Sequence, residues 1–167
     1  IKEQILSDGG HFERSPMYHS IILEDLLDIY NLAVFYDTNI ENHIIKKNIN
    51  QMLNWLFYMS HPDQKLSFFN DTTNNVSANF TSLSYYSDNL NLKSIRKEKD
   101  FVEFQNSGYS VIRSQNYHCI IDRADLGPDY NPGHGHADTL SFELSVFKKR
   151  LIVNSGISTY EDNKIRK

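Results

Sequence analysis

Residues 15–35, SPMYHSIILEDLLDIYNLAVF, decide the fold of the first half of the chain. Ser15-Pro16 is a helix-start signal, because serine caps free backbone N–H groups and proline suits the first helical position. On a helical wheel, apolar residues then cover about half of the circumference. This arc consists of Ile22, Leu23, Leu26, Leu27, Ile29, Tyr30, Ala33 and Val34. So wide an apolar face predicts burial against more than one neighbour, as in a layered helical assembly.

A second helix is predicted directly after the first. Thr38 and Glu41 form a capping box, and the helix must end before Pro62. The short connection makes the two helices an antiparallel pair. A loop is predicted for the turn-rich residues 61–78, and a short third helix for residues 79–90.

The pattern changes after residues 93–100, KSIRKEKD, a charged stretch that we predict to be a linker. Beyond it, β-branched and aromatic residues alternate with Gly and Asn, which is typical of strands and turns. The predicted strands are Phe101–Gln105, Gly108–Ser114, Tyr117–Arg123, Leu140–Phe147 and Arg150–Asn154. The predicted fold class is therefore α+β multidomain, with a helical part over residues 1–92 and a β-sheet part over residues 101–167.

Composition excludes several classes of protein. The 167 residues include 17 Lys and Arg against 21 Asp and Glu, for a net charge of −4, which is not the basic footprint of a nucleic-acid-binding protein. No apolar run approaches the roughly 20 residues that span a bilayer, so no membrane insertion is expected. The single cysteine, Cys119, excludes an intramolecular disulfide framework and a cysteine-based zinc cluster. The chain opens without an initiator Met or a targeting segment, and we expect an internal fragment of a longer protein.

His134-Gly135-His136 is the strongest local signal for chemistry. Two histidines one residue apart point the same way on an extended backbone, and suit two ligands of one metal or a ligand beside a proton-transfer group. Asp138 adds a nearby carboxylate. The alternative is a solvated loop. A cupin-type metal site is disfavoured, because Glu143 would lie on the opposite strand face from His136.

Tyr18 is the second candidate, at the third position of the first helix. The positive end of the helix dipole would favour a phenolate there, which a base needs because the pKa of tyrosine is ordinarily about 10. The alternative is a tyrosine that packs at a helix start. Glu13, Arg14, His19 and Asp71 are candidate substrate contacts. Their structural alternatives are an exposed ion pair for the first two, a core histidine for the third and a turn for the last.

Other polar residues have structural interpretations. Lys148–Arg150 are predicted to form a solvent-exposed hairpin tip, and His118 and Arg123 fall on opposite faces of a strand. His43 and His61 belong to no recognisable constellation.

Two stretches together resemble the heparinase II/III-like polysaccharide lyases, including heparinase and alginate lyase relatives. They are SDGGHFERSPMYHSIILEDLLDI, residues 7–29, and GPDYNPGHGHADTLSFELSVFKKRLIVNSGISTYE, residues 127–161. The resemblance implies the end of an (α/α) toroid followed by the start of an antiparallel β-sandwich, with the active site between them. It also implies β-elimination at a uronic acid, in which a base removes the C5 proton and the 4-O-linked sugar leaves.

The resemblance assigns roles to individual residues. Tyr18 matches the catalytic tyrosine, the acid and for one epimer also the base, and His134 matches the catalytic histidine. His136 matches the first histidine ligand of a structural zinc. Asn154 stands where the family has a zinc carboxylate, and a neutral amide is a poorer ligand. The remaining zinc ligand is expected beyond Lys167.

An acidic polysaccharide is the implied partner, and a periplasmic or secreted location follows from the resemblance alone. Since the net charge is negative, attraction of a polyanion must come from a local basic cleft, for which Arg14, Arg113 and Arg123 are candidates. The family motif that neutralises the substrate carboxylate is expected before Ile1, so the isolated fragment should be inactive. Oligomeric state is not predicted.

Two other functions fit the same residues. The first is a non-catalytic protein that binds glycans, or is associated with a surface polysaccharide, on the same scaffold. The second is a metal-dependent oxidoreductase or isomerase built on His134 and His136.

Overall fold

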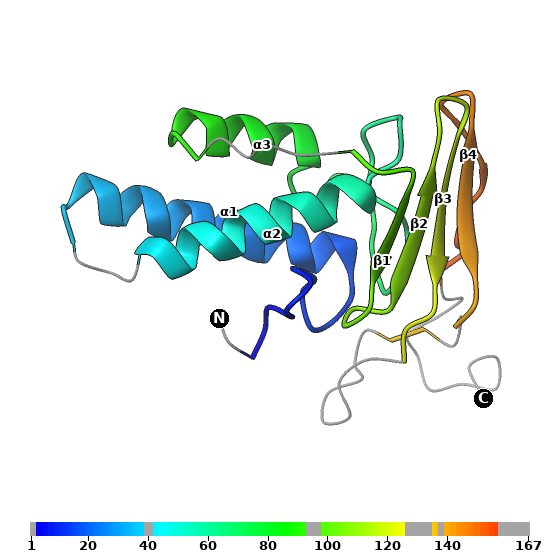
Figure 1. Cartoon of the computed structure of the whole chain (residues 1–167), viewed down its shortest axis with the longest axis horizontal. Helices are drawn as coiled ribbons and strands as arrows, with labels where there is room; N and C mark the ends of the chain where they lie inside the picture. The colour runs from blue at the N-terminus through cyan, green and yellow to red at the C-terminus, as the bar shows by residue number, and fades with distance from the viewer. Residues whose placement is uncertain (1–2, 39–41, 93–97, 126–134, 137–138, 157–167) are drawn as a thin grey trace.

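The computed structural model describes residues 3–38, 42–92, 98–125, 135–136 and 139–156. The predicted helices and strands are all present within these ranges. Three helices pack together on one side of the molecule, and a single sheet stands on the other side (Figure 1). Among the described helices, none has the length and apolar character required to cross a membrane.

Helices α1 (Pro16–Phe35) and α2 (Asn42–Tyr58) form an antiparallel pair, and α3 (Phe80–Asn89) packs against both. The core between them is built from leucine, isoleucine and methionine side chains. The apolar arc predicted for α1 is only partly buried: the side chains of Ile29 and Val34 are 45% and 54% exposed. Their exposure follows because α2 and α3 cover one side of α1 in the described part of the chain.

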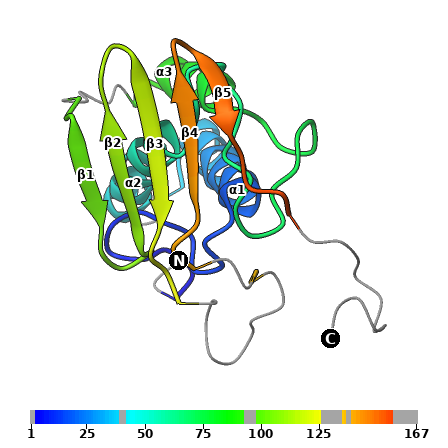
Figure 2. The ribbon, with the colours of Figure 1, turned by 90° about the vertical axis from the view of Figure 1, so that its right-hand side faces the viewer.

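The five strands form one antiparallel sheet in the order of the sequence (Figure 2). They are β1 (Phe101–Phe104), β2 (Tyr109–Arg113), β3 (Tyr117–Asp122), β4 (Phe142–Val146) and β5 (Lys149–Ile152). The predicted hairpin between β4 and β5 is confirmed. Its two turn residues, Phe147 and Lys148, both have positive φ angles, 48° and 66°, as a two-residue hairpin turn of type I′ requires.

One face of the sheet packs on the end of α2 through an aromatic cluster. The indole ring of Trp55 is fully buried, with its centroid 5.8 Å from that of Tyr109 on β2. The cluster consists of Trp55, Tyr58, Met59, Phe69, Phe104, Tyr109, Val111 and Ile120. This cluster makes the helices and the sheet one packed unit.

The glycine pair before α1 fits between α2 and the β1–β2 turn. A Cβ atom on Gly9 would lie 2.5 Å from the backbone oxygen of Gln51, and one on Gly10 would lie 2.7 Å from the Cβ of Ser107. Only glycine allows this approach, and Gly9 also has a φ of +91°. Asp8 then accepts hydrogen bonds from the backbone N–H and the hydroxyl of Ser107. The segment Asp8-Gly9-Gly10 therefore joins the stretch before α1 to α2 and to the β1–β2 turn.

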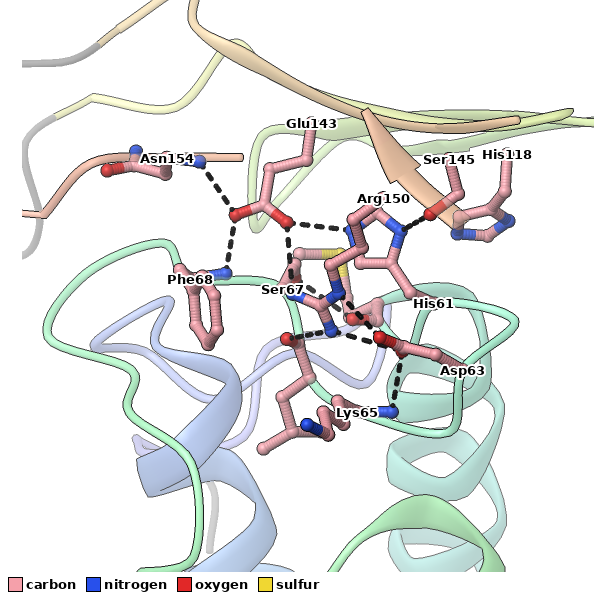
Figure 3. Close-up of polar contacts among 12 residues, drawn as sticks. His61, Asp63, Lys65, Ser67, Phe68, His118, Glu143, Ser145, Arg150 and Asn154 are labelled. Carbon is pink, nitrogen blue, oxygen red and sulfur yellow. Dashed lines mark hydrogen bonds and ion pairs between the residues drawn. The ribbon is translucent and has the colours of Figure 1, made fainter. Parts of the chain in front are cut away.

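A second connection between the helical part and the sheet is centred on the carboxylate of Glu143 on β4, which is fully buried (Figure 3). One carboxylate oxygen accepts the Nε2–H of His61 at 2.7 Å and lies 3.6 Å from the guanidinium of Arg150. The other oxygen accepts the backbone N–H groups of Phe68 at 2.7 Å and Asn154 at 3.1 Å. A buried charge needs this number of donors, because it has lost its hydration.

Arg150 and His61 extend the network to the loop between α2 and α3, residues 59–79. The guanidinium of Arg150 forms two hydrogen bonds with Asp63, at 2.9 and 3.3 Å, and one with the backbone oxygen of Leu66. The other ring nitrogen of His61 lies 2.7 Å from the hydroxyl of Ser145. Partial burial acts to raise the pKa of Asp63, but hydrogen bonds from Arg150 and the Lys65 N–H, with the Arg150 charge, lower it overall.

Two sequence interpretations are therefore wrong. His61 does belong to a constellation, and Arg150 is not a solvent-exposed tip residue, since its side chain is 12% exposed and turned toward the α2–α3 loop. The reason is the register of the β4–β5 pair. Arg150 lies opposite Ser145, on the face of the sheet that carries Glu143.

We predict that Glu143→Gln lowers the free energy of unfolding by about 3 kcal/mol, because the amide cannot compensate the donors that converge on the carboxylate. Glu103→Gln is the matched control, since Glu103 pairs with Arg123 where both side chains are about 40% exposed. It should cost less than about 1 kcal/mol. Urea denaturation measures both values, and equal losses would contradict the assigned role of Glu143.

Candidate active site at the start of helix α1

The first turn of α1 is held by a residue 55 positions later in the chain. Ser15 occupies the predicted cap position, but its side chain makes no capping hydrogen bond. Instead, the hydroxyl of Thr72 accepts the backbone N–H of Met17 at 3.1 Å and lies 3.1 Å from the hydroxyl of Ser15. The α2–α3 loop thus supplies the cap of α1. By fixing where this helix begins, the loop also fixes the position of Tyr18.

Asn70 and Asp71, which precede Thr72, bring three segments together. Both residues have left-handed backbone conformations, with φ angles of 48° and 61°, which Asn and Asp tolerate better than most residues. The side-chain amide of Asn70 donates to the backbone oxygen of Arg14 and to the hydroxyl of Tyr109, and its oxygen accepts the N–H of His136. This one side chain contacts the approach to α1, strand β2 and the His136 segment.

Asp71 binds the imidazole of His136 directly. The Oδ1 atom of Asp71 lies 2.7 Å from Nε2 of His136, and the two side chains are only 8% and 6% exposed. The Asp71 N–H lies 3.1 Å from the same nitrogen. The shorter distance favours an Nε2–H that donates to the carboxylate. Asp71 therefore occupies a turn, as the sequence suggested, and also anchors a histidine of the predicted active-site motif.

Tyr18 is partly buried, and the carboxylates of Asp71 and Glu13 act electrostatically on its phenol. Burial raises the pKa of its phenol above the usual 10, and the negative charges of Asp71 and then Glu13 raise it further. The expectation that the helix start favours a phenolate is therefore wrong, because burial, and then the charges of the two carboxylates, raise the pKa of this phenol. Tyr18 is a protonated phenol at neutral pH, which is the form of a proton donor.

Glu13 and Arg14 flank this site without pairing with each other among the described residues. A carboxylate oxygen of Glu13 lies 3.9 Å from Nδ1 of His11. The guanidinium of Arg14 donates to the backbone oxygen of Asp125, and its own backbone oxygen accepts the hydroxyl of Tyr109 at 2.9 Å. Arg14 thus ties the approach to α1 to the ends of β2 and β3.

His19 is completely buried and has a structural environment. Its Nδ1 accepts the N–H of His11, its Nε2 lies 3.0 Å from the backbone oxygen of Met52, and its ring stacks on Trp55. Burial lowers the pKa of His19 to about 3. A proton on Nδ1 would also point at the N–H of His11, which already donates to that nitrogen. This geometry favours a core histidine over a substrate contact.

The zinc prediction names His136 and Asn154 as ligands. His134 lies outside the described residues. Within the described ranges, no three His, Cys, Asp or Glu side chains gather as a metal site. Nε2 of His136 binds Asp71, and the side-chain oxygen of Asn154 accepts the N–H of Gly156 at 2.8 Å. The described residues by themselves therefore do not make up a zinc site.

Sequence reasoning did not find Asn70 and Thr72, which position the site. The sequence FFNDTT carries a signal, because an Asn-Asp pair in a loop suits consecutive left-handed residues. Their partners lie between 39 and 66 residues away in the chain, so no local pattern identifies them.

Comparisons with known proteins give one consistent result. Residues 1–96 match the family model described as heparinase II/III N-terminus, and residues 96–167 match the model described as heparinase II/III-like, C-terminal. No curated protein matched the chain.

Solved structures show the same fold. The chain is similar to the heparan sulfate lyase HepC from Pedobacter heparinus, with 20% identity and a TM-score of 0.74 over 99% of this chain and 28% of that one. It is also similar to a structure described as heparinase III, with 20% identity and a TM-score of 0.72 over 95% of this chain and 29% of that one. The chain thus spans less than a third of the length of these relatives. The predicted fold class, the end of an (α/α) toroid followed by the start of a β-sandwich, is confirmed.

We predict that acidification destabilises the protein well above the pH at which carboxylates titrate. The pKa values of His19 and His118 are lowered to about 3, in both cases chiefly by burial. Between pH 6.5 and 3 the unfolded chain therefore binds more protons than the folded chain. The free energy of unfolding should fall by up to about 1.4 kcal/mol per pH unit for each histidine.

Denaturation at a series of pH values measures this slope. His19→Gln should reduce the slope by the contribution of one proton, up to about 1.4 kcal/mol per pH unit. His43→Gln, at an exposed position of α2, should leave the slope unchanged. An equal slope in the wild type and His19→Gln would contradict the assignment.

We further predict that Asp71→Asn lowers the pKa of Tyr18, because it removes the charge that raises this pKa most. Tyrosine ring-carbon NMR, with the signal assigned by Tyr18→Phe, follows this titration. Asp88→Asn, at the end of α3, is the control. A wild-type Tyr18 pKa below 10 would disprove the electrostatic description of the site.

Proposed function

Because the chain belongs to the heparinase II/III-like family, we propose that it is part of a polysaccharide lyase that cleaves uronic-acid-containing glycans by β-elimination. The observation that carries the proposal is the protonated phenol of Tyr18 beside the Asp71–His136 pair. The charge of Asp71 acts on the Tyr18 phenol, and the same carboxylate binds His136, which supports a role for Tyr18 as the proton donor. Elimination needs an acid and a base within reach of two neighbouring sugar carbons.

In this mechanism, Tyr18 is the acid. Its phenol donates a proton to the glycosidic oxygen at C4 as the C4–O bond breaks. The base takes the proton from C5, and the electrons of the C5–H bond form the C4–C5 double bond. A raised phenol pKa keeps the proton on Tyr18 until the leaving oxygen develops negative charge.

We assign the base to His134, which precedes His136 by two residues. Asp71 and Asn70 act as positioning residues, because they bind the side chain and the backbone of His136 and so anchor the histidine segment. The carboxylate of the sugar must also be neutralised to stabilise the enolate-like intermediate.

The cellular setting and the metal are also proposals. The substrate is an acidic polysaccharide or oligosaccharide, and the site of action is the periplasm or the exterior of the cell. A structural zinc held by His136 is a separate hypothesis. Metal analysis of the intact protein, purified with zinc present and then dialysed, tests it without an activity assay.

The test uses the intact protein that contains this segment. A panel of uronic-acid polymers is incubated with it, and the ultraviolet absorbance of the C4–C5 double bond is followed. We predict that one polymer gives a rise and that Tyr18→Phe reduces its rate by about 10²- to 10⁴-fold, the usual contribution of a general acid. Tyr85→Phe, at a ring that is 70% exposed on α3, is the control and should retain full activity.

Full activity in Tyr18→Phe would show that the acid is misassigned. No absorbance change with any polymer, from protein shown to be folded, would favour the alternative of a scaffold that binds glycans without cleaving them.

A further inference from the structure

The guanidinium of Arg113, at the end of β2, lies over an aromatic ring and forms no ion pair with any residue that the structure describes. Its central carbon is 4.3 Å from the ring centroid of Phe57 and 5.8 Å from that of Tyr58. Its Nη1 atom is buried and makes no hydrogen bond within the described part of the chain. A buried donor without an acceptor is costly, so an acceptor from a ligand would be favoured there.

Arg113 lines a surface cavity with a volume of about 330 Å³. Lys99 and Lys148 add two exposed ammonium groups at its rim, and Gln115 and Asn116 add neutral amides. This is the size expected of a pocket for a small ligand or one unit of a larger one. The floor is rigid, since Ser145 lines the cavity and is hydrogen-bonded to His61 in the Glu143 network.

The cavity also contains two carboxylates, those of Glu98 and Asp100. Both residues are exposed, and neither forms an ion pair with Arg113 among the residues that the structure describes. Water screens these carboxylates and also the exposed ammonium groups of Lys99 and Lys148, and the two pairs of charges offset one another, whereas the partly buried guanidinium is held on Phe57. Arg113 therefore determines which ligand the cavity selects.

This cavity is separate from the site at Tyr18. Arg113 lies at one end of β2, opposite His118, whereas Tyr109 at the other end is bonded to Arg14 next to α1. The two ends are four residue steps apart along the strand, or roughly 13 Å at the usual rise per residue.

We propose that Arg113, with Lys99 and Lys148, forms a second binding site for the carboxylate or sulfate group of an acidic glycan. That the anion belongs to a glycan rests on the proposed function, whereas the anion site itself does not. A guanidinium presents parallel N–H groups that match two oxygens of a carboxylate or sulfate. The ring of Phe57, with its centroid 4.3 Å from the central carbon of this group, holds the guanidinium beside the cavity.

The test follows arginine Nε signals by NMR in the intact protein, with three small probes: sodium glucuronate, inorganic sulfate and neutral glucose. We expect the Arg113 signal to shift with glucuronate or sulfate and not with glucose. Which anion acts more strongly identifies the group that the site prefers. The Arg123 signal, from a residue paired with Glu103, should not move.

Affinity for a saturated uronic-acid oligosaccharide is then measured by calorimetry, in the Tyr18→Phe background so that no cleavage occurs. Arg113→Gln should weaken binding about tenfold, as loss of a charge-assisted hydrogen bond does. Lys148→Gln, at an exposed position where folding is not at risk, should weaken it about threefold, and Arg123→Gln should leave it within twofold.

An Arg113 signal that no anion shifts would overturn the proposal, whether or not the protein cleaves a polymer. Shifts with free anions but unchanged oligosaccharide affinity in both Arg113→Gln and Lys148→Gln would overturn its assignment to a glycan. Oligosaccharide binding at Arg113, in a wild-type protein that cleaves no polymer, would support the second binding site. The same result would contradict only the proposed lyase function.

Discussion

The buried carboxylate of Glu143 is the constraint on which the rest of the structure depends. It lies on the face of the sheet that meets the helices, and it is stable there only because donors from both parts of the chain converge on it. Those donors come from the α2–α3 loop and from Asn154, just after β5. The carboxylate therefore requires one specific position of this loop against the sheet (Figure 3).

The same loop builds the candidate active site. From the Glu143 network it continues through the buried ring of Phe69 to Asn70, Asp71 and Thr72. Thr72 caps α1, and Asn70 and Asp71 bind His136. Tyr18 from the helical part and His136 from the β-sheet part thus meet through a segment that belongs to neither predicted motif. This explains how a site assembled from distant stretches of sequence can have a fixed geometry.

The sequence contains most of the local structure and little of this assembly. Helix α1 and the five strands follow from side-chain periodicity and turn residues, and all were predicted within a few residues. The roles of His61 and Arg150 depend on the register of β4 with β5 and on a loop contact over 80 residues away in sequence, which no periodicity encodes. Tyr18 was identified as a candidate, but the direction of its pKa shift was not, because Asp71 reaches it only through the fold.

The central claim is that the α2–α3 loop holds the histidine segment through the contact between Asp71 and His136. A double-mutant cycle with Asp71→Asn and His136→Gln, read as free energies of unfolding in the intact protein, tests it most directly. The account predicts a coupling energy of about 1–3 kcal/mol, as residues in one buried hydrogen-bonded pair show. Additive effects, with a coupling within about 0.3 kcal/mol of zero, would contradict it.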